Sequence, residues 1–505
     1  MLATTALVRP RPKRVARPSW IAALAIIALG LSSGLATAQE AKYEGKGKIL
    51  GVTSTSEEAK AFFWDALDDA ENIFFERAAI RLQQALALDP EFGLARVVYG
   101  WAAPNLTSEK RQSEISRGIA ALSEASTGQL QTALAFREFV AGNASAARSM
   151  FVVASEMMPD DPHLAYFAAW LTNNADGPRE GIPALRSVTE RFPDSAPAYN
   201  ILAYALWQSG DEAGGLKAAR QYVERAPDHP NSHDTYAELL QWAGRYSEAM
   251  AEYRRAVELD ASYASAYIGT AEIHQLMGQG RQARERLSQA IQLEIVSEGA
   301  VAARPPSVQA RLNRMRAQAN SYLMDGNRKA GMDLLASVAT EAEANDMKSL
   351  ATLAHQQLAV ADAILAGGRN IESHLQNGAE IGGADNPQQH MYAAWAYGSA
   401  GQMAPAHEAL KKLEEATAGD ENWRTPVHSL RGLLHLQVNE TTEAMKELEQ
   451  ADPEDVYVKA LLAECYKKMG RSHDAQALRD EVLNNRQLNL FSPLTPIAYL
   501  HVKKL

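Results

Sequence analysis

A constant spacing between the ends of helix-like stretches constrains the fold of this chain more than any other feature of its sequence. The residues that close four successive stretches are equally spaced: Pro159, Pro193, Pro227 and Ala261. Within each interval, two stretches with apolar residues at helical spacing flank a turn, which contains a glycine such as Gly244. A helix pair that recurs at a fixed interval cannot bury its apolar faces alone, so we expect neighbouring pairs to stack into a helical repeat.

One interval, residues 231–261, shows how its two helices fit together. Small and aromatic side chains share one face of each helix: His233, Tyr236, Ala237 and Leu240 in the first, and Ala249, Tyr253 and Ala256 in the second. The alanines are expected where the helices cross closely. This pattern, and its period of roughly 34 residues, resembles the tetratricopeptide repeat (TPR). The resemblance implies an all-α fold, a right-handed α-solenoid of stacked antiparallel helix pairs (a TPR superhelix), with a concave groove lined by the first helix of each pair.

The repeat pattern extends over most of the chain and divides it into segments. We expect a lead-in segment over residues 39–56, an N-terminal repeat array over 57–295 and a C-terminal repeat array over 309–483. Residues 296–308 break the phase and are rich in proline, alanine and glycine, which predicts a linker or bend. Residues 484–505 contain two prolines and no helical period, so we expect a non-helical tail that caps the last repeat.

Residues 1–38 have the layout of a secretory signal peptide. A basic stretch over residues 9–17 precedes an apolar run over 21–31, and Ala36-Thr37-Ala38 supplies the small residues that a signal peptidase reads. An uncleaved signal anchor is the alternative, because the apolar run is nearly long enough to span a bilayer. Cleavage after Ala38 is favoured, so we expect the mature chain in the periplasm or outside the cell, without stable insertion into a membrane.

The charge of the expected mature chain argues against two classes of partner. Removal of residues 1–38 leaves 45 basic against 61 acidic residues, a net charge of −16. A surface of this sign repels phosphate backbones and anionic headgroups, so we expect no binding to nucleic acid. The single cysteine excludes a disulfide framework within the chain and a metal site built from several thiolates. Cys465 lies on the apolar side of a predicted helix, where we expect a small buried hydrophobe.

The sequence contains no established catalytic motif in a suitable context, so we expect a non-enzymatic protein without catalytic residues, cofactor or metal. Asp65, Asp68 and Asp69 share one helical face, which we interpret as a solvated helix start. His229 and His233 are close in the sequence, but Pro230 lies between them. Because proline fits only the first turn of a helix, we expect His229 in the loop and His233 in the helix. We therefore interpret His233 as a packed core histidine and a zinc site as the less favoured alternative.

The candidate partner-binding residues lie one step beyond the packed face of the first helices: Tyr166, Trp170, Asn173, Asn200, Tyr204, Trp207, Asp234, Glu238, Gln241, Trp242, Glu272 and Gln275. Tryptophans in successive units, interleaved with amides and acids, indicate a contact surface. TPR domains that clamp a C-terminal carboxylate carry basic residues in this groove, whereas Asp234, Glu238 and Glu272 are acidic here. An acidic, aromatic groove suits a protein or peptide partner that is basic or contains proline.

These observations favour a protein–protein interaction scaffold of the bacterial cell envelope that binds a partner segment in the groove. The alternative is a glycan-binding or small-molecule-binding module that uses the same tryptophan-lined groove. An enzyme with a site built from loops is the least favoured class, because no catalytic constellation is present.

The signal-peptide interpretation can be tested directly. Cleavage after Ala38 predicts that N-terminal sequencing of the protein purified from its native cell begins at Gln39. A purified protein that still carries the basic stretch 9–17 would instead support a membrane anchor.

Overall fold

The computed structural model describes residues 52–104, 106–123, 125–300, 308–492, 494–503 and 505, and this described part is all-helical. The predicted signal peptide and most of the lead-in segment lie outside these residues. No described helix combines the length and the apolar character needed to cross a membrane. The chain divides into two compact units, which meet in sequence between Leu239 and Leu240.

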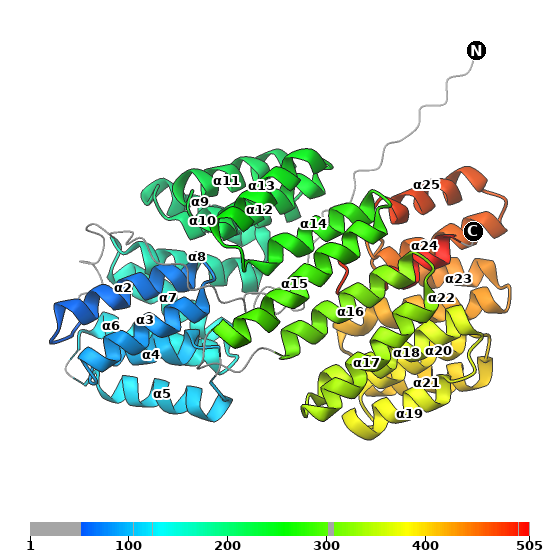
Figure 1. Cartoon of the computed structure of the whole chain (residues 1–505), viewed down its shortest axis with the longest axis horizontal. Coiled ribbons are helices and arrows are strands. Elements are labelled where there is room, and N and C mark those ends of the chain that lie inside the picture. Colours follow the sequence, from blue (N-terminus) through cyan, green and yellow to red (C-terminus); the bar gives the residue numbers. More distant parts are fainter. Residues whose placement is uncertain (1–51, 105, 124, 301–307, 493, 504) are drawn as a thin grey trace, which may run out of the picture. The chain divides into compact units, whose positions relative to one another are not determined.

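Unit 1 consists of successive antiparallel helix pairs (Figure 1). Its helices are α2 (Glu57–Glu71), α3 (Phe75–Leu88), α4 (Gly93–Ala102), α5 (Ser108–Ala120), α6 (Thr127–Val140), α7 (Ala144–Met157), α8 (Pro162–Asp176), α9 (Pro178–Arg191), α10 (Ala196–Gln208), α11 (Glu212–Arg225) and the first part of α12 (Pro230–Trp242). The most extensive contacts join the two helices of one pair, such as α2 with α3 and α10 with α11. The all-α architecture of stacked pairs is therefore confirmed.

Unit 2 continues the same architecture (Figure 1). Its helices are α13 (Tyr246–Leu259), α14 (Ala264–Leu276), α15 (Gly280–Ala300), α16 (Val308–Met324), α17 (Arg328–Ala344), α18 (Lys348–Ala366), α19 (Ile371–Gly382), α20 (Pro387–Ser399), α21 (Met403–Ala416), the short 3₁₀ helix η1 (Glu421–Trp423), α22 (Arg424–Gln437), α23 (Thr441–Leu448), α24 (Val456–Lys468), α25 (Ser472–Leu483) and α26 (Leu494–Lys503). Helix α15 continues to Ala300, so the first residues of the predicted linker at 296–308 are helical.

Small residues at a fixed repeat position allow the helices to approach closely. Alanines occupy this position in four successive first helices, and all are buried: Ala169, Ala203, Ala237 and Ala271. In the second helix of one pair, Gly215 takes the place of an alanine. A Cβ atom added to Gly215 would lie 2.9 Å from the carbonyl oxygen of Ala203. The pair α10–α11 is therefore packed more closely than an alanine would allow.

The turns predicted between paired helices depend on glycine. Gly210, Gly244 and Gly278 occupy equivalent positions in successive repeats and have φ angles of +89°, +77° and +71°. Only glycine adopts this left-handed conformation without a steric penalty, so each glycine ends one helix and redirects the chain into the next. The expected glycine turns are confirmed at these three positions.

The last residues of the chain differ from the expected non-helical tail. Residues 494–503 form helix α26, which contacts α24 and α25 but also α16. Pro496 lies in the first turn of α26, where a helix has no hydrogen-bond partner for the backbone N–H that proline lacks. The proline is therefore compatible with a helix start, which the sequence interpretation did not consider.

A glycine substitution tests the close helix packing. A Cβ atom on Gly118 in α5 would lie 2.6 Å from the carbonyl oxygen of Gly93 and 2.9 Å from the backbone nitrogen of Val97 in α4. Because both obstacles are backbone atoms, rotation of a side chain cannot relieve the clash. We expect Gly118→Ala to lower the free energy of unfolding by about 1–3 kcal/mol, measured by urea denaturation.

The matched control is Gly378→Ala, in the interior of α19. There the nearest atom to the added Cβ, Oε1 of Gln389, lies at an ordinary contact distance of 3.4 Å. We expect no loss of stability and a gain of about 0.5–1 kcal/mol, because alanine restricts the unfolded chain. Equal destabilisation by both substitutions would contradict the role of close packing at Gly118.

Candidate functional site

The predicted partner-binding residues occupy equivalent positions in successive first helices. Trp170 in α8, Tyr204 in α10 and Glu238 in α12 share one repeat position, and Tyr166, Asn200 and Asp234 share another. Their side chains also interact between helices. The Tyr204 hydroxyl donates a hydrogen bond of 2.5 Å to Oε2 of Glu238, and Thr235 donates one of 3.1 Å to Oδ1 of Asn200. Successive repeats of unit 1 therefore place these groups at corresponding points of neighbouring first helices.

The structure divides the predicted set by accessibility. Five members are buried: Tyr166, Asn200, Trp207, Gln241 and Gln275. Trp207 is only 7% exposed, so most of its ring packs within the protein. The other seven are half-buried: Trp170, Asn173, Tyr204, Asp234, Glu238, Trp242 and Glu272. The half-buried members within unit 1 form what we call the acidic-aromatic face: Trp170, Asn173, Tyr204, Asp234 and Glu238.

The Trp170 ring is held in a defined orientation on this face. It lies parallel to the Tyr166 ring, at an interplanar angle of 4° and a centroid distance of 6.3 Å. The Phe139 ring packs against it at 5.3 Å with its edge. A half-exposed aromatic ring that is already immobilised loses little conformational entropy when it contacts a partner.

Glu238 is a carboxyl group in an unfavourable environment for its charge. Burial raises the pKa of Glu238, and the hydrogen bond from Tyr204 opposes this shift. The same burial, together with the Glu238 carboxylate, raises the pKa of Tyr204 well above its ordinary value. A cationic group placed beside Glu238 would stabilise its ionised form, so the face is electrostatically suited to a basic ligand.

The acidic residues at the end of α2 are not the solvated helix face that we expected. Asp69 is 1% exposed and forms ion pairs with Arg77 at 2.5 Å and with Arg81 at 2.6 Å. Burial, with the neighbouring Glu71 and Asp69 carboxylates, raises the pKa of Asp68 to about 6. The prediction failed because α3 packs against α2 and supplies the two arginines, a contact that helical spacing within α2 does not reveal.

A buried ion pair connects this cluster to α8. Oε1 of Glu71 lies 2.8 Å from Nδ1 of His163, and both side chains are almost completely buried. The Trp64 ring stacks on the His163 ring at 5.5 Å. Burial alone would lower the pKa of His163, but the Glu71 carboxylate and then Asp161 and Asp68 outweigh it and raise this pKa to about 9. The imidazole is therefore a cation at neutral pH.

A second buried contact joins Asn72, at the end of α2, to α11 and α12. The Tyr222 hydroxyl donates a hydrogen bond of 2.9 Å to Oδ1 of Asn72 and accepts one of 3.1 Å from Nδ2 of Asn231. These partners are 150 and 9 residues apart from Tyr222 in the chain. Neither this contact nor the pair Glu71–His163 was predicted, since no local pattern in the sequence joins residues so distant.

Burial determines the state of His233, His229 and Cys465. His233 is buried, and its Nε2 lies 3.0 Å from the carbonyl oxygen of Pro227, which confirms a packed core histidine. Burial, followed by repulsion from Arg77, lowers the pKa of His229 to about 4, so that ring is neutral. Cys465 is fully buried, and burial raises the pKa of its thiol to about 12, in agreement with a small hydrophobic residue.

The predicted residues of unit 2 make contacts within the chain. Gln241 accepts a hydrogen bond of 3.1 Å from the Tyr253 hydroxyl, and Gln275 accepts one of 2.7 Å from Ser321. Oε1 of Glu272 accepts a hydrogen bond of 3.2 Å from the backbone N–H of Leu490, near the C-terminus. In unit 2, residues expected to bind a partner therefore bind another segment of the same chain.

Comparisons with known proteins identify the repeat. Residues 243–278 match the model of the TPR repeat family. No curated protein matches the chain. Among solved structures, MamA is 14% identical with a TM-score of 0.29, over 33% of this chain and 96% of its own. The TPR protein TTC0263 of Thermus thermophilus is 18% identical with a TM-score of 0.31, over 37% of this chain and 97% of its own. The human IFIT1 dimer with m7Gppp-AAAA is 14% identical with a TM-score of 0.41, over 87% of this chain and 96% of its own. All three TM-scores are below 0.5.

The pair Glu71–His163 predicts a pH-dependent stability. The raised pKa means that between about pH 6.5 and 9 only the folded state keeps the His163 proton. The contribution of this proton to the free energy of unfolding is therefore complete below pH 6.5 and is lost as the pH rises through 9. We expect the free energy of unfolding, from urea denaturation, to fall by on the order of 2 kcal/mol between pH 7 and 9.5. His163→Gln, which does not titrate, should remove this fall. An equal fall in both proteins would contradict the charged pair.

Proposed function

We propose that this chain, which belongs to the tetratricopeptide-repeat family, is a non-enzymatic scaffold of the bacterial cell envelope. In this proposal it binds a segment of a protein partner on the acidic-aromatic face of unit 1. TPR repeats are generally modules for protein interaction, which supports the broad role. The observation that carries the specific proposal is the placement of Trp170, Tyr204 and Glu238 at one repeat position of three successive first helices.

The chemistry of this face selects the kind of partner. A segment that lies across α8, α10 and α12 would meet an aromatic ring, a phenol and a carboxylate in order. Aromatic anchors commonly supply most of the binding energy of an interface, while charges contribute specificity and association rate. Since Glu238 and Asp234 are acidic and half-buried, the partner segment should carry Lys or Arg near an apolar or proline residue that packs on Trp170.

The proposed envelope location rests on the sequence of residues 1–38 alone. A net charge of −16 for the cleaved chain is consistent with recognition of basic segments and with repulsion of anionic lipid and nucleic acid.

A glycan is the second candidate ligand, because sugars stack on tryptophan rings. Trp170 already has Tyr166 parallel to it and Phe139 at its side, which reduces the area of ring that a sugar could cover. We therefore favour the peptide. Identification of what is bound, by mass spectrometry for protein and by saccharide analysis for glycan, distinguishes the two.

Substitution of Trp170 tests the proposed face. We expect Trp170→Ala to weaken partner binding at least about tenfold, because the partner loses its aromatic anchor. The measurement is quantitative mass spectrometry of proteins cross-linked to the tagged full-length protein in the native envelope, followed by titration with the identified partner. Glu238→Gln, which retains an acceptor for Tyr204, should weaken binding less, and more at low salt than at high salt if the partner is basic.

Lys217→Ala provides the matched control, since Lys217 is exposed on α11, the second helix of its pair. This variant should bind the partner as the wild type does. A folded Trp170→Ala protein with normal partner binding would show that the contact lies elsewhere. A lowered melting temperature with lost binding would assign Trp170 to the core rather than to the face.

A further inference from the structure

Residues 485–492, which we call the C-terminal strap, cross α14 and α16 within unit 2 as an irregular segment. Their backbone is held by side chains of these helices. Nδ2 of Asn320 donates hydrogen bonds of 2.8 Å to the carbonyl of Leu490 and 3.3 Å to that of Ser492. Nη2 of Arg316 donates one of 3.2 Å to the carbonyl of Phe491, and Glu272 accepts one from the N–H of Leu490.

Hydrogen bonds from side chains to the main chain of a segment are also common where a protein binds a peptide ligand. The helices bind main-chain groups of residues 490–492, which a segment of another sequence could provide if it turned in the same way. Side-chain selection comes from two leucines: Leu488 is 6% exposed and Leu490 is fully buried, whereas Asn489 between them is exposed. The two leucines lie on either side of a turn start at Asn489, whose carbonyl accepts a hydrogen bond of 3.1 Å from the N–H of Ser492. This turn presents the main chain of Leu490 and Phe491 to the helices.

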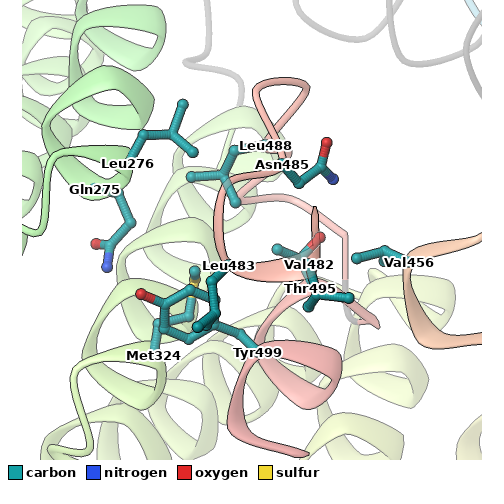
Figure 2. A pocket seen from close by; sticks show the side chains of 10 residues that line it. All are labelled: Gln275, Leu276, Met324, Val456, Val482, Leu483, Asn485, Leu488, Thr495 and Tyr499. Atoms are coloured by element: carbon teal, nitrogen blue, oxygen red, sulfur yellow. The ribbon is translucent and has the colours of Figure 1, made fainter. Parts of the chain in front are cut away.

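The surface under the strap has a pocket that the strap itself helps to line (Figure 2). Leu276 of α14 and Leu488 of the strap lie at the same end of this pocket (Figure 2). Met324 of α16 and Tyr499 of α26 also line it, with Gln275 as a polar neighbour. The pocket is mainly apolar and has room for about one water molecule, so Leu488 already fills most of the space beside α14 and α16.

Helix α26 has anchors of its own, apart from the strap. Helix α26 is anchored independently by Ile497, Ala498, Leu500 and Val502, all buried in clusters with residues of other unit 2 helices. Nζ of Lys503 also donates a hydrogen bond of 3.0 Å to the carbonyl of Met324. By contrast, the strap lies between the end of α25 and the start of α26 and has no secondary structure of its own. Such segments open locally at a lower free energy than packed helices.

We propose that the surface of α14 and α16 is a second peptide-binding site, which the strap occupies as a tethered competitor. Its partner is a segment with leucines at alternate positions that turns as residues 489–492 do. The main chain of this segment offers the N–H and carbonyl groups that the strap now offers to Glu272, Asn320 and Arg316. This site lies in unit 2 and does not depend on the acidic-aromatic face of unit 1.

Tethering decides when this site is available. A segment connected through a short link has an effective concentration of roughly millimolar at its own site. A free peptide with the same contacts at micromolar concentration therefore competes poorly with the strap. Loss of the strap's two leucine anchors should give the free peptide access to the site.

The test uses the full chain and a fluorescent peptide that copies residues 485–492, followed by anisotropy. We expect Leu488→Ser with Leu490→Ser in the protein to lower the apparent Kd for this peptide at least about tenfold relative to the wild type, because the tethered competitor is weakened. Adding Asn320→Ala to that variant should raise the Kd again at least about tenfold. A control peptide with both leucines replaced by serine should not bind.

Two results would overturn the proposal. One is a folded strap variant that binds the peptide no better than the wild type. The other concerns the wild type alone, and applies even if the strap variant fails to fold. Hydrogen exchange should show the N–H of Leu490 exchanging at least about a hundredfold faster than the amides of α16 and α26. Equal rates in all three would make the strap a fixed part of the fold.

Discussion

The close approach of paired helices is the constraint on which the rest of the structure depends. Ala203, Ala237 and Ala271 are fully buried at one repeat position, and Gly118 meets the backbone of α4 directly. Because these positions carry almost no side chain, the helices approach each other closely there. Other positions of the first helices then recur in space once per repeat, as Tyr204 and Glu238 do through their hydrogen bond.

Burial of charge is the second organising feature of unit 1. Asp69 is neutralised by two arginines of α3, and Glu71 by the His163 cation of α8. A buried pair of this kind adds little net stability but strongly penalises any arrangement that leaves one partner alone. The contact between Glu71 and His163 therefore specifies how the first helix pair meets α8.

The same repeat position of the first helices is partly exposed in unit 1 and is contacted by the strap in unit 2. In unit 1, Trp170, Tyr204 and Glu238 remain half-exposed. In unit 2, the strap bonds to Glu272, which occupies the same repeat position as Glu238. Side chains of the first helices α14 and α16 thus bind the main chain of another segment of the same protein.

The sequence by itself determined the repeat and its local consequences. The constant period, the buried alanines, the glycine turns and the packed His233 all follow from contacts within a helix or between adjacent helices, which leave a periodic trace. Only the tertiary structure decided that Glu71 meets His163, 92 residues away. It also decided that Trp207 is mostly buried and that the strap lies on α14 and α16. These features depend on contacts between segments far apart in the chain, and the arrangement of neighbouring helix pairs that creates such contacts has no counterpart in the periodic pattern of the sequence.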